Sequence, residues 1–149
     1  MRVTSAVYLA IGCLLGSAGA ALADPPDYYV GAGVRAGLND STAAVLNSKA
    51  EVADFGDLSL SVRPELMVGS EFEMRLPITV EGQLDQGIYP YAGAGIAYSD
   101  GSTINPMVTI GTDLGITNNL VLDVELNVIF KTAASDTDTE LVGALNYAF

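Results

Sequence analysis

The chain has 149 residues, about the length of one domain, and carries 18 acidic residues against six basic ones, for a net charge of −12 at pH 7. So strong a negative charge argues against binding to nucleic acid or to an anionic membrane surface through electrostatic attraction. The chain has no histidine, and its single cysteine is Cys13. This composition excludes Ser-His and Cys-His nucleophile pairs and the common zinc sites.

The first 23 residues have the pattern of a secretory signal peptide, and we predict that its cleavage makes Asp24 the mature N-terminus. Arg2 forms a short basic region, residues 6–15 are an apolar run, and Ala21-Leu22-Ala23 is an A-x-A cleavage site. Lipidation at Cys13 is a weaker alternative, because the apolar run continues past that residue. Cleavage would remove Arg2 and leave five basic against 18 acidic residues, a net charge of −13 (5 minus 18).

From Tyr28 to Phe149 apolar and polar residues alternate with a period of two, in short segments separated by turn residues. The predicted strands are 28–38, 48–55, 57–68, 72–82, 88–98, 105–115, 120–131 and 139–149. Most reach the roughly 9–11 residues of a tilted membrane strand, and no later segment has the run of about 18 apolar residues that a spanning helix needs. We therefore predict an all-β fold in which residues 24–149 form an eight-stranded antiparallel up-and-down transmembrane β-barrel.

The predicted connections alternate between two ends of such a barrel. Segments 39–47, 69–71, 99–104 and 132–138 fall at one end, which would be the outer end. Gly56 and segments 83–87 and 116–119 fall at the other end, together with both chain termini. This arrangement is typical of barrels whose termini lie on the periplasmic side.

The segment 120–131 raises the question of which strand face points inward. It sets Leu122, Val124, Leu126, Val128 and Phe130 against Asp123, Glu125, Asn127 and Ile129. In a soluble sandwich the apolar set would form the core, whereas in a membrane barrel it would face lipid. The arginines lie mid-strand on polar faces, and no basic residue lies in a turn. This is the distribution expected of a narrow lumen, where buried carboxylates need positive charges beside them. We therefore predict a lumenal ion-pair network of Arg35, Arg63, Glu65, Glu73, Arg75, Asp113, Asp123 and Glu125.

One pair in this network can be predicted by register. A three-residue turn at 69–71 is the turn that places apolar Val68 opposite Phe72, and it then puts Glu65 opposite Arg75 inside the barrel. If 83–87 is the next turn, Gly95 lies beside Arg75 and leaves room for its side chain to reach Asp113, Asp123 or Glu125.

The aromatic residues cluster toward the strand ends, which predicts two interfacial girdles in a membrane barrel. One girdle consists of Tyr28, Tyr29, Phe55, Tyr89, Tyr91, Tyr147 and Phe149, and the other of Phe72, Tyr98 and Phe130.

The last residues, L-V-G-A-L-N-Y-A-F, resemble the C-terminus of the small eight-stranded outer-membrane barrels of the OmpA/OmpX-like group. Leu145, Tyr147 and Phe149 alternate like the terminal signal that the barrel-assembly machinery recognises in this family, although Gly143 is one place from the usual glycine. Y-V-G-A-G-V (29–34) and Y-A-G-A-G-I (91–96) also look like the glycine-rich strands of these barrels. The resemblance implies an outer-membrane location, with membrane lipid and the assembly machinery as partners and no cofactor.

Three functions remain open at this point. The first is an integral outer-membrane barrel with a structural or surface-interaction role and a lumen filled by charged side chains. The second is a narrow, low-conductance channel. The third is a secreted soluble barrel that binds an apolar ligand.

Catalysis and metal binding find less support in the sequence. Outer-membrane acyl hydrolases and acyltransferases of similar barrels depend on histidine, so we predict that the chain is not an enzyme. We assign Asp123 and Glu125 to lumenal ion pairing rather than to acid–base chemistry. The alternating carboxylates of the acidic string 136–140 could bind calcium, but the pattern favours a solvated acidic loop. We therefore predict no metal site.

Overall fold

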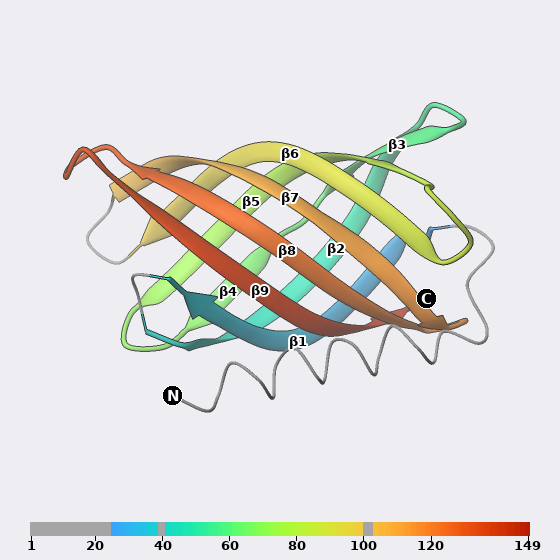
Figure 1. The fold of residues 1–149 in the computed structure, drawn as a ribbon, viewed down its shortest axis with the longest axis horizontal. Coiled ribbons are helices and arrows are strands. Elements are labelled where there is room, and N and C mark those ends of the chain that lie inside the picture. The colour runs from blue at the N-terminus through green and yellow to red at the C-terminus, as the bar shows by residue number, and fades with distance from the viewer. Residues whose placement is uncertain (1–24, 39–40, 100–102) are drawn as a thin grey trace.

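The computed structural model describes residues 25–38, 41–99 and 103–149, and the predicted signal peptide 1–23 and Asp24 lie outside them. Its strands are β1 (Tyr28–Gly37), β2 (Ala43–Asp54), β3 (Leu58–Val62), β4 (Glu65–Val68), β5 (Phe72–Gly82), β6 (Ile88–Ser99), β7 (Thr103–Thr117), β8 (Leu120–Lys131) and β9 (Asp136–Ala148). Figure 1 shows these strands running obliquely side by side. Among the described residues no helix is long and apolar enough to cross a membrane.

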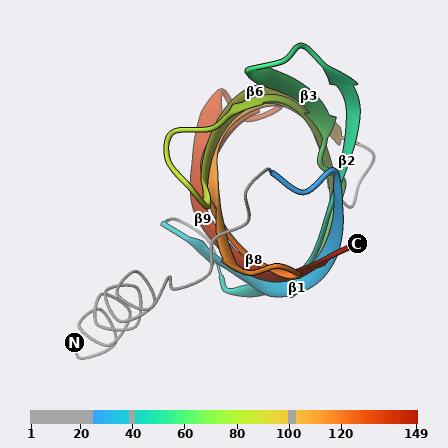
Figure 2. The ribbon, with the colours of Figure 1, turned by 90° about the vertical axis from the view of Figure 1, so that its right-hand side faces the viewer.

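The strands close into a ring. Each barrel strand pairs antiparallel with the next one along the chain, and β9 pairs with β1. β3 and β4 are two halves of one barrel strand, since both lie between β2 and β5. The ring formed by the described residues therefore has eight strands, and Figure 2 shows it as a closed oval. The predicted all-β fold, an eight-stranded antiparallel up-and-down barrel, is confirmed.

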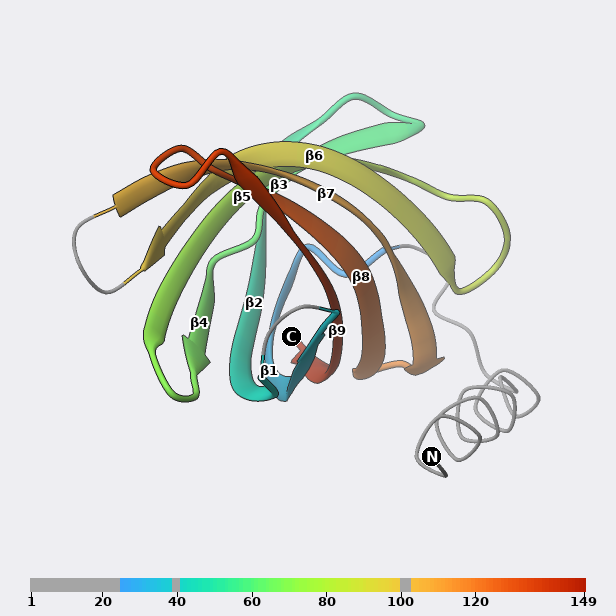
Figure 3. The same ribbon diagram turned by 60° about the vertical axis from the view of Figure 1, so that its left-hand side comes forward.

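The strand made of β3 and β4 is interrupted at Pro64, whose ring nitrogen has no hydrogen to donate to a neighbouring strand. Its carbonyl still accepts the backbone N–H of Ser48 at 3.1 Å, and Arg63 donates its own N–H to the carbonyl of Pro77 at 3.0 Å. The register against β5 is the same on both sides of the break, and Figure 3 shows β4 lying between β5 and β2. The alternation of side chains therefore continues, and Arg63 points into the barrel.

The hairpin between β4 and β5 has the register that the sequence predicts. Val68 lies opposite Phe72, and Glu65 lies opposite Arg75. The side-chain period of two makes this register sensitive to turn length, because a turn of two residues would have placed apolar positions opposite polar ones.

The register predicted between β5 and β6 is wrong by two residues. Arg75 lies opposite Ala97 instead of Gly95. The cause is a tight turn of residues 85–88, closed by a backbone hydrogen bond of 3.0 Å and permitted by Gly87, whose φ is 77°. Because the shift is an even number, the strand faces are unchanged and a small residue still lies beside Arg75.

The connections alternate between two ends of the barrel, as predicted. The terminus end carries the start of β1, the end of β9 and the turns 55–57, 83–87 and 118–119. At the loop end lie the ends of β1 and β6, the starts of β2 and β7, and the connections 69–71 and 132–135. β2 begins at Ala43, earlier than the predicted strand 48–55, because its inner positions Ala43 and Val45 are apolar and hide the alternation. The separation in sequence between β1 and β2 is correspondingly smaller than predicted.

The distribution of apolar and charged side chains between the outer and inner strand faces is the reverse of that in a soluble protein. Val34, Leu46 and Ile110 point outward and are 59%, 55% and 60% exposed, whereas Arg63 and Asp113 point inward and are 1% and 0% exposed. In β8 the carboxylates are likewise buried, and the alternate apolar residues lie outside. So extended an apolar exterior matches the hydrocarbon of a bilayer and would be a liability in water.

Candidate functional site

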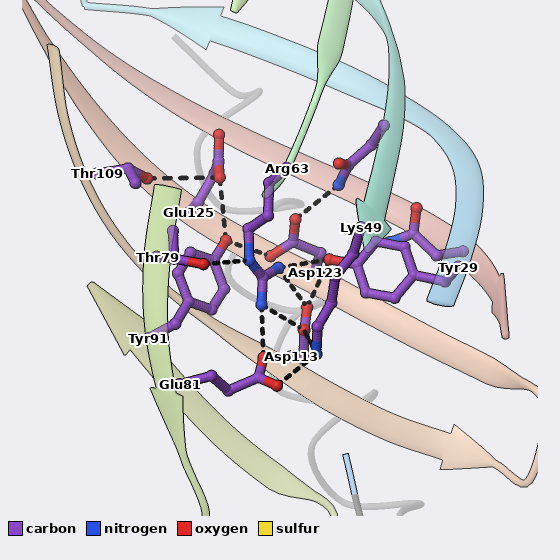
Figure 4. Close-up of polar contacts among 12 residues, drawn as sticks. Tyr29, Lys49, Arg63, Thr79, Glu81, Tyr91, Thr109, Asp113, Asp123 and Glu125 are labelled. Atoms are coloured by element: carbon purple, nitrogen blue, oxygen red, sulfur yellow. Dashed lines mark hydrogen bonds and ion pairs between the residues drawn. The ribbon is translucent and has the colours of Figure 1, made fainter. Parts of the chain in front are cut away.

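The terminus half of the lumen is filled by what we call the Arg63 cluster: Arg63, Lys49, Glu81, Asp113 and Tyr29 (Figure 4). The Nη2 atom of Arg63 lies 2.5 Å from Glu81 Oε2 and 2.9 Å from Asp113 Oδ2. Lys49 binds the same two carboxylates, forming a close ion pair with Glu81 and lying 3.7 Å from Asp113 Oδ2. All five side chains are buried. The cluster therefore connects β1, β2, β5, β7 and the break between β3 and β4.

Two tyrosine rings complete the surroundings of Arg63. Its Cζ atom lies 3.6 Å from the ring centroid of Tyr91 and 5.8 Å from that of Tyr29, distances at which cation–π attraction is effective. Arg63 Nη1 donates to the Tyr29 hydroxyl at 2.5 Å, and that hydroxyl donates to Asp113 at 3.0 Å. Gly111 provides the space for Tyr91, since a Cβ at Gly111 would lie 2.4 Å from the Tyr91 hydroxyl oxygen.

The prediction that Tyr29, Tyr89 and Tyr91 belong to a lipid-facing girdle is wrong, because all three side chains point into the barrel and are buried. They lie near the expected end of the barrel, but their odd-numbered positions share the inner face with Arg63 and Glu81. The aromatic residues that are exposed on the outside are Tyr28, Phe55, Tyr147 and Phe149 at the terminus end and Phe72, Tyr98 and Phe130 at the loop end.

Two further carboxylates, Asp123 and Glu125, lie beside the Arg63 cluster and are held by uncharged groups. The Tyr91 hydroxyl lies 2.6 Å from Asp123 Oδ1 and 3.0 Å from Glu125 Oε2. Asn47 donates to Asp123 at 2.6 Å, and Asn127 donates to Glu125 at 2.5 Å. Such hydrogen bonds reduce the free-energy cost of burying carboxylates without adding a compensating charge.

The loop half of the lumen contains a second group, the Arg–Glu ring, formed by Arg35, Glu73, Arg75 and Glu140. Arg35 Nη1 lies 2.8 Å from Glu73 and 3.2 Å from Glu140. Arg75 Nη2 lies 2.9 Å from Glu73 and 2.5 Å from Glu140. Each arginine therefore pairs with both glutamates, and the four charges balance. The ring connects β5 with β1 and β9 across the barrel.

The predicted contacts of Glu65 and Arg75 are wrong, although their register is right. Glu65 is buried, but no described residue donates a hydrogen bond to either of its carboxylate oxygens. Arg75 forms its ion pairs with Glu73 and Glu140 rather than with Asp113, Asp123 or Glu125, because it lies in the loop half of the lumen. The arginine that reaches Asp113 is Arg63.

Lys49, Glu81 and Glu140 are buried charged residues of the lumen that the predicted network did not include. Lys49 was placed at a strand end, because the predicted strand began at 48, yet it lies well inside β2. Glu81 lies on the same polar face of β5 as Arg75, so the alternation of residues along this strand could have predicted that Glu81 points into the lumen. Glu140 was assigned to the acidic string 136–140 and instead closes the Arg–Glu ring.

The acidic string 136–140 does not converge on one point. Lys131 pairs with Asp138 at 2.5 Å, while Glu140 binds the two arginines of the ring. Within the described ranges no three acidic, histidine or cysteine side chains are arranged to hold a metal ion.

The predicted assembly signal lies on the outside of the last strand. Leu145 and Tyr147 point outward from β9, and Phe149 follows the strand with its side chain 74% exposed. The Phe149 ring stacks on that of Tyr28, with centroids 6.4 Å apart. These residues are therefore accessible at the seam where β9 meets β1.

A double-mutant cycle should separate the observed partner of Arg75 from its register neighbour. We expect Arg75→Met and Glu140→Gln to show a coupling energy of about 1–3 kcal/mol, because each removes the other's buried charge partner. Arg75→Met with Glu65→Gln is the matched cycle and should show a smaller coupling. The measurement is urea unfolding of the barrel in detergent micelles. A larger coupling with Glu65 would contradict the observed ion pairs.

The fold is similar to those of solved membrane barrels. A protein from the de novo design of transmembrane β-barrels is 19% identical, with a TM-score of 0.66 over 86% of this chain and 100% of that one. The outer membrane protein Ail of Yersinia pestis is 11% identical, with a TM-score of 0.57 over 84% and 100%. The outer membrane enzyme PagL is 17% identical, with a TM-score of 0.51 over 80% and 97%. No protein-family model and no curated protein sequence matches the chain.

Identities this low establish the fold alone. The chain has the fold of the small eight-stranded transmembrane β-barrels, and its resemblance to the OmpA/OmpX-like group is confirmed at that level.

Proposed function

We propose that this chain is an integral outer-membrane β-barrel with a structural or surface-interaction role, closed by its own charged side chains. The observation that carries the proposal is an apolar exterior combined with ion pairs that cross the lumen. A barrel of eight strands is just wide enough for side chains to fill. Export by the signal peptide 1–23 and insertion by the barrel-assembly machinery belong to the same proposal.

The soluble alternative requires the apolar faces to line the interior. The interior instead holds buried arginine, lysine, glutamate, aspartate and asparagine side chains among a smaller set of apolar ones, such as Val45 and Met67. An apolar ligand would have to displace these buried ion pairs, which is costly.

The short outer connections favour a structural role over a large recognition surface. The loop-end connections 38–42, 69–71, 100–102 and 132–135 contain no lysine, arginine or aromatic residue. Ail, whose structure was solved in complex with the heparin analogue sucrose octasulfate, has the same fold. Our chain has no cationic side chain in these connections for a sulfated sugar, so a loop partner would have to be recognised through hydroxyl, amide and carboxylate groups.

A non-enzymatic role is part of the proposal, although the fold also occurs in PagL, an outer membrane enzyme. The chain has no histidine. The candidate acid–base pair, Asp123 and Glu125, is buried and hydrogen-bonded to Asn47, Tyr91 and Asn127. These interactions support a packing role for the two carboxylates.

Two measurements test the proposal. We expect the protein in the membrane fraction of expressing cells, with boiled and unboiled samples migrating differently on a detergent gel. We also expect the purified barrel to give no resolved conductance steps in a planar bilayer, because the Arg63 cluster and the Arg–Glu ring both cross the lumen. A heat-denatured sample is the control. Recovery as a soluble protein without a gel shift would contradict the membrane barrel, and steady single-channel steps would establish the channel alternative instead.

A further inference from the structure

A cavity of about 690 Å³ opens at the terminus end of the barrel, between the 55–57 and 83–87 turns. Six acidic residues line it, and none of its lining residues is a lysine or arginine. The six are Asp27, Glu51, Asp54, Asp57, Glu81 and Asp85. Exposed carboxylates alone are ordinarily just a solvated surface, so the cavity needs independent evidence of a ligand.

That evidence is Ser59, which lines the cavity from the inner face of β3. Its side chain is 7% exposed, and its hydroxyl has no hydrogen-bond partner among the described residues. Buried hydroxyl groups ordinarily have a partner, and an unpartnered one in a cavity wall is available to accept a hydrogen bond from a bound ligand. Ser59 lies opposite both Asp54 and Glu81 in the sheet, at the centre of the acidic lining.

The two ends of the barrel differ in charge. The smaller cavity at the loop end, about 190 Å³, is lined by Arg35 and Lys131 as well as by Glu71, Glu73 and Asp138. At the terminus end, the nearest cations are Lys49 and Arg63, which are buried below the cavity and bind Glu81. The negative potential of the rim is therefore not compensated within the cavity lining, and a low-dielectric wall strengthens the attraction for a cation.

The arrangement of the carboxylates selects the kind of cation. No three of them are placed to hold one metal ion in the described structure. They are instead spread around the cavity: Asp27 and Glu51 lie together, joined by a backbone hydrogen bond of 2.8 Å, while Asp57 and Asp85 belong to separate turns. A ligand with several positive charges spaced along a chain fits this distribution better than a single ion.

The cavity also offers apolar surface between its charges. Leu58 and Leu84 belong to its lining, and both side chains are at least half exposed. Methylene groups that separate ammonium groups could pack on these leucines while the charges reach the rim. We infer that the terminus-end cavity binds a linear organic polyamine, with ammonium groups at the Glu51 and Asp57 sides of the rim and an N–H donor to Ser59.

The test is calorimetric titration of spermidine into the full-length barrel in a zwitterionic detergent at low salt. We expect one spermidine per barrel, with an affinity that falls as salt is added. Glu51→Gln with Asp57→Asn should weaken binding by about tenfold, since two ion pairs are lost. Ser59→Ala should weaken it severalfold by removing the buried acceptor.

The matched control is Glu71→Gln with Asp136→Asn, which removes the same two charges at the loop end. We expect it to leave spermidine binding nearly unchanged, and a gel-shift assay verifies that every variant folds. The inference is overturned if wild-type protein gives no binding heat, if both double variants lose equal affinity, or if magnesium at equal ionic strength binds as tightly as spermidine.

Discussion

Replacing Arg63 with methionine is expected to lower the free energy of unfolding by about 3–5 kcal/mol, the usual effect of removing one partner of a buried ion pair. Arg63 binds Asp113 and Glu81 at 2.9 and 2.5 Å, and it also contacts the Tyr91 ring. Without it, Lys49 would be the remaining cation of the cluster for two buried carboxylates. Methionine keeps much of the side-chain volume, so the effect measures charge more than packing.

A second substitution distinguishes charge from packing. Arg63→Met combined with Asp113→Asn should recover part of the lost stability, because the uncompensated charge is removed. Lys131→Met is the control, since Lys131 pairs with Asp138 at the loop end and its side chain is 40% exposed. Because the lysine end of this pair is partly exposed to solvent, we expect the pair to contribute only about 0–1 kcal/mol.

Stability can be followed by urea unfolding, using circular dichroism and the mobility of the folded band, because the chain has no tryptophan for fluorescence. Equal losses from the Arg63 and Lys131 substitutions would show that the Arg63 cluster is not a stabilising feature of the lumen. Strict additivity of Arg63→Met and Asp113→Asn would show that the two residues are not coupled.

Deletion of Phe149 is expected to reduce folded barrel in cells to a small fraction of the wild-type amount, while changing stability in vitro by only about 0.5–1.5 kcal/mol, the contribution of one aromatic pair. The side chain is 74% exposed, and its observed ring contact is with Tyr28 at 6.4 Å. So little packing cannot account for an assembly failure. We attribute the expected failure to loss of the terminal signal for the barrel-assembly machinery.

Tyr28→Ala provides the matched control, because it removes the same ring contact and leaves the C-terminus intact. We expect this variant to assemble in cells at close to the wild-type amount. The readouts are the folded band in isolated membranes and, for the same variants, refolding from urea into detergent. Normal assembly of the Phe149 deletion, or an equal defect in Tyr28→Ala, would remove the terminal signal as the explanation.

The sequence alone was sufficient to count the barrel strands and to separate their apolar faces from their charged faces, although it placed the start of β2 at residue 48 instead of Ala43. Period-two alternation separated Leu122 and Val124 from Asp123 and Glu125, and the mid-strand arginines indicated which set lies inside. The same parity determined the register of the 69–71 hairpin, because a shift of one residue would exchange its faces. It could also have placed Tyr29 correctly, since Tyr29 alternates with the outward-facing residues of β1.

The ion-pair partners within the lumen were decided only by the tertiary structure. Register relates only residues on neighbouring strands. Arg75 instead pairs with Glu140, and Arg63 with Asp113, across the interior of the barrel. These distances depend on the tilt and stagger of all eight strands and on the oval cross-section, which no local pattern contains. The sequence also left the length of the turn between β5 and β6 open. The tight turn at 85–88 shifted the register of these two strands by two residues, without changing which face any side chain occupies. Alternation thus determined which residues enter the lumen, and closure of the barrel determined which of them meet.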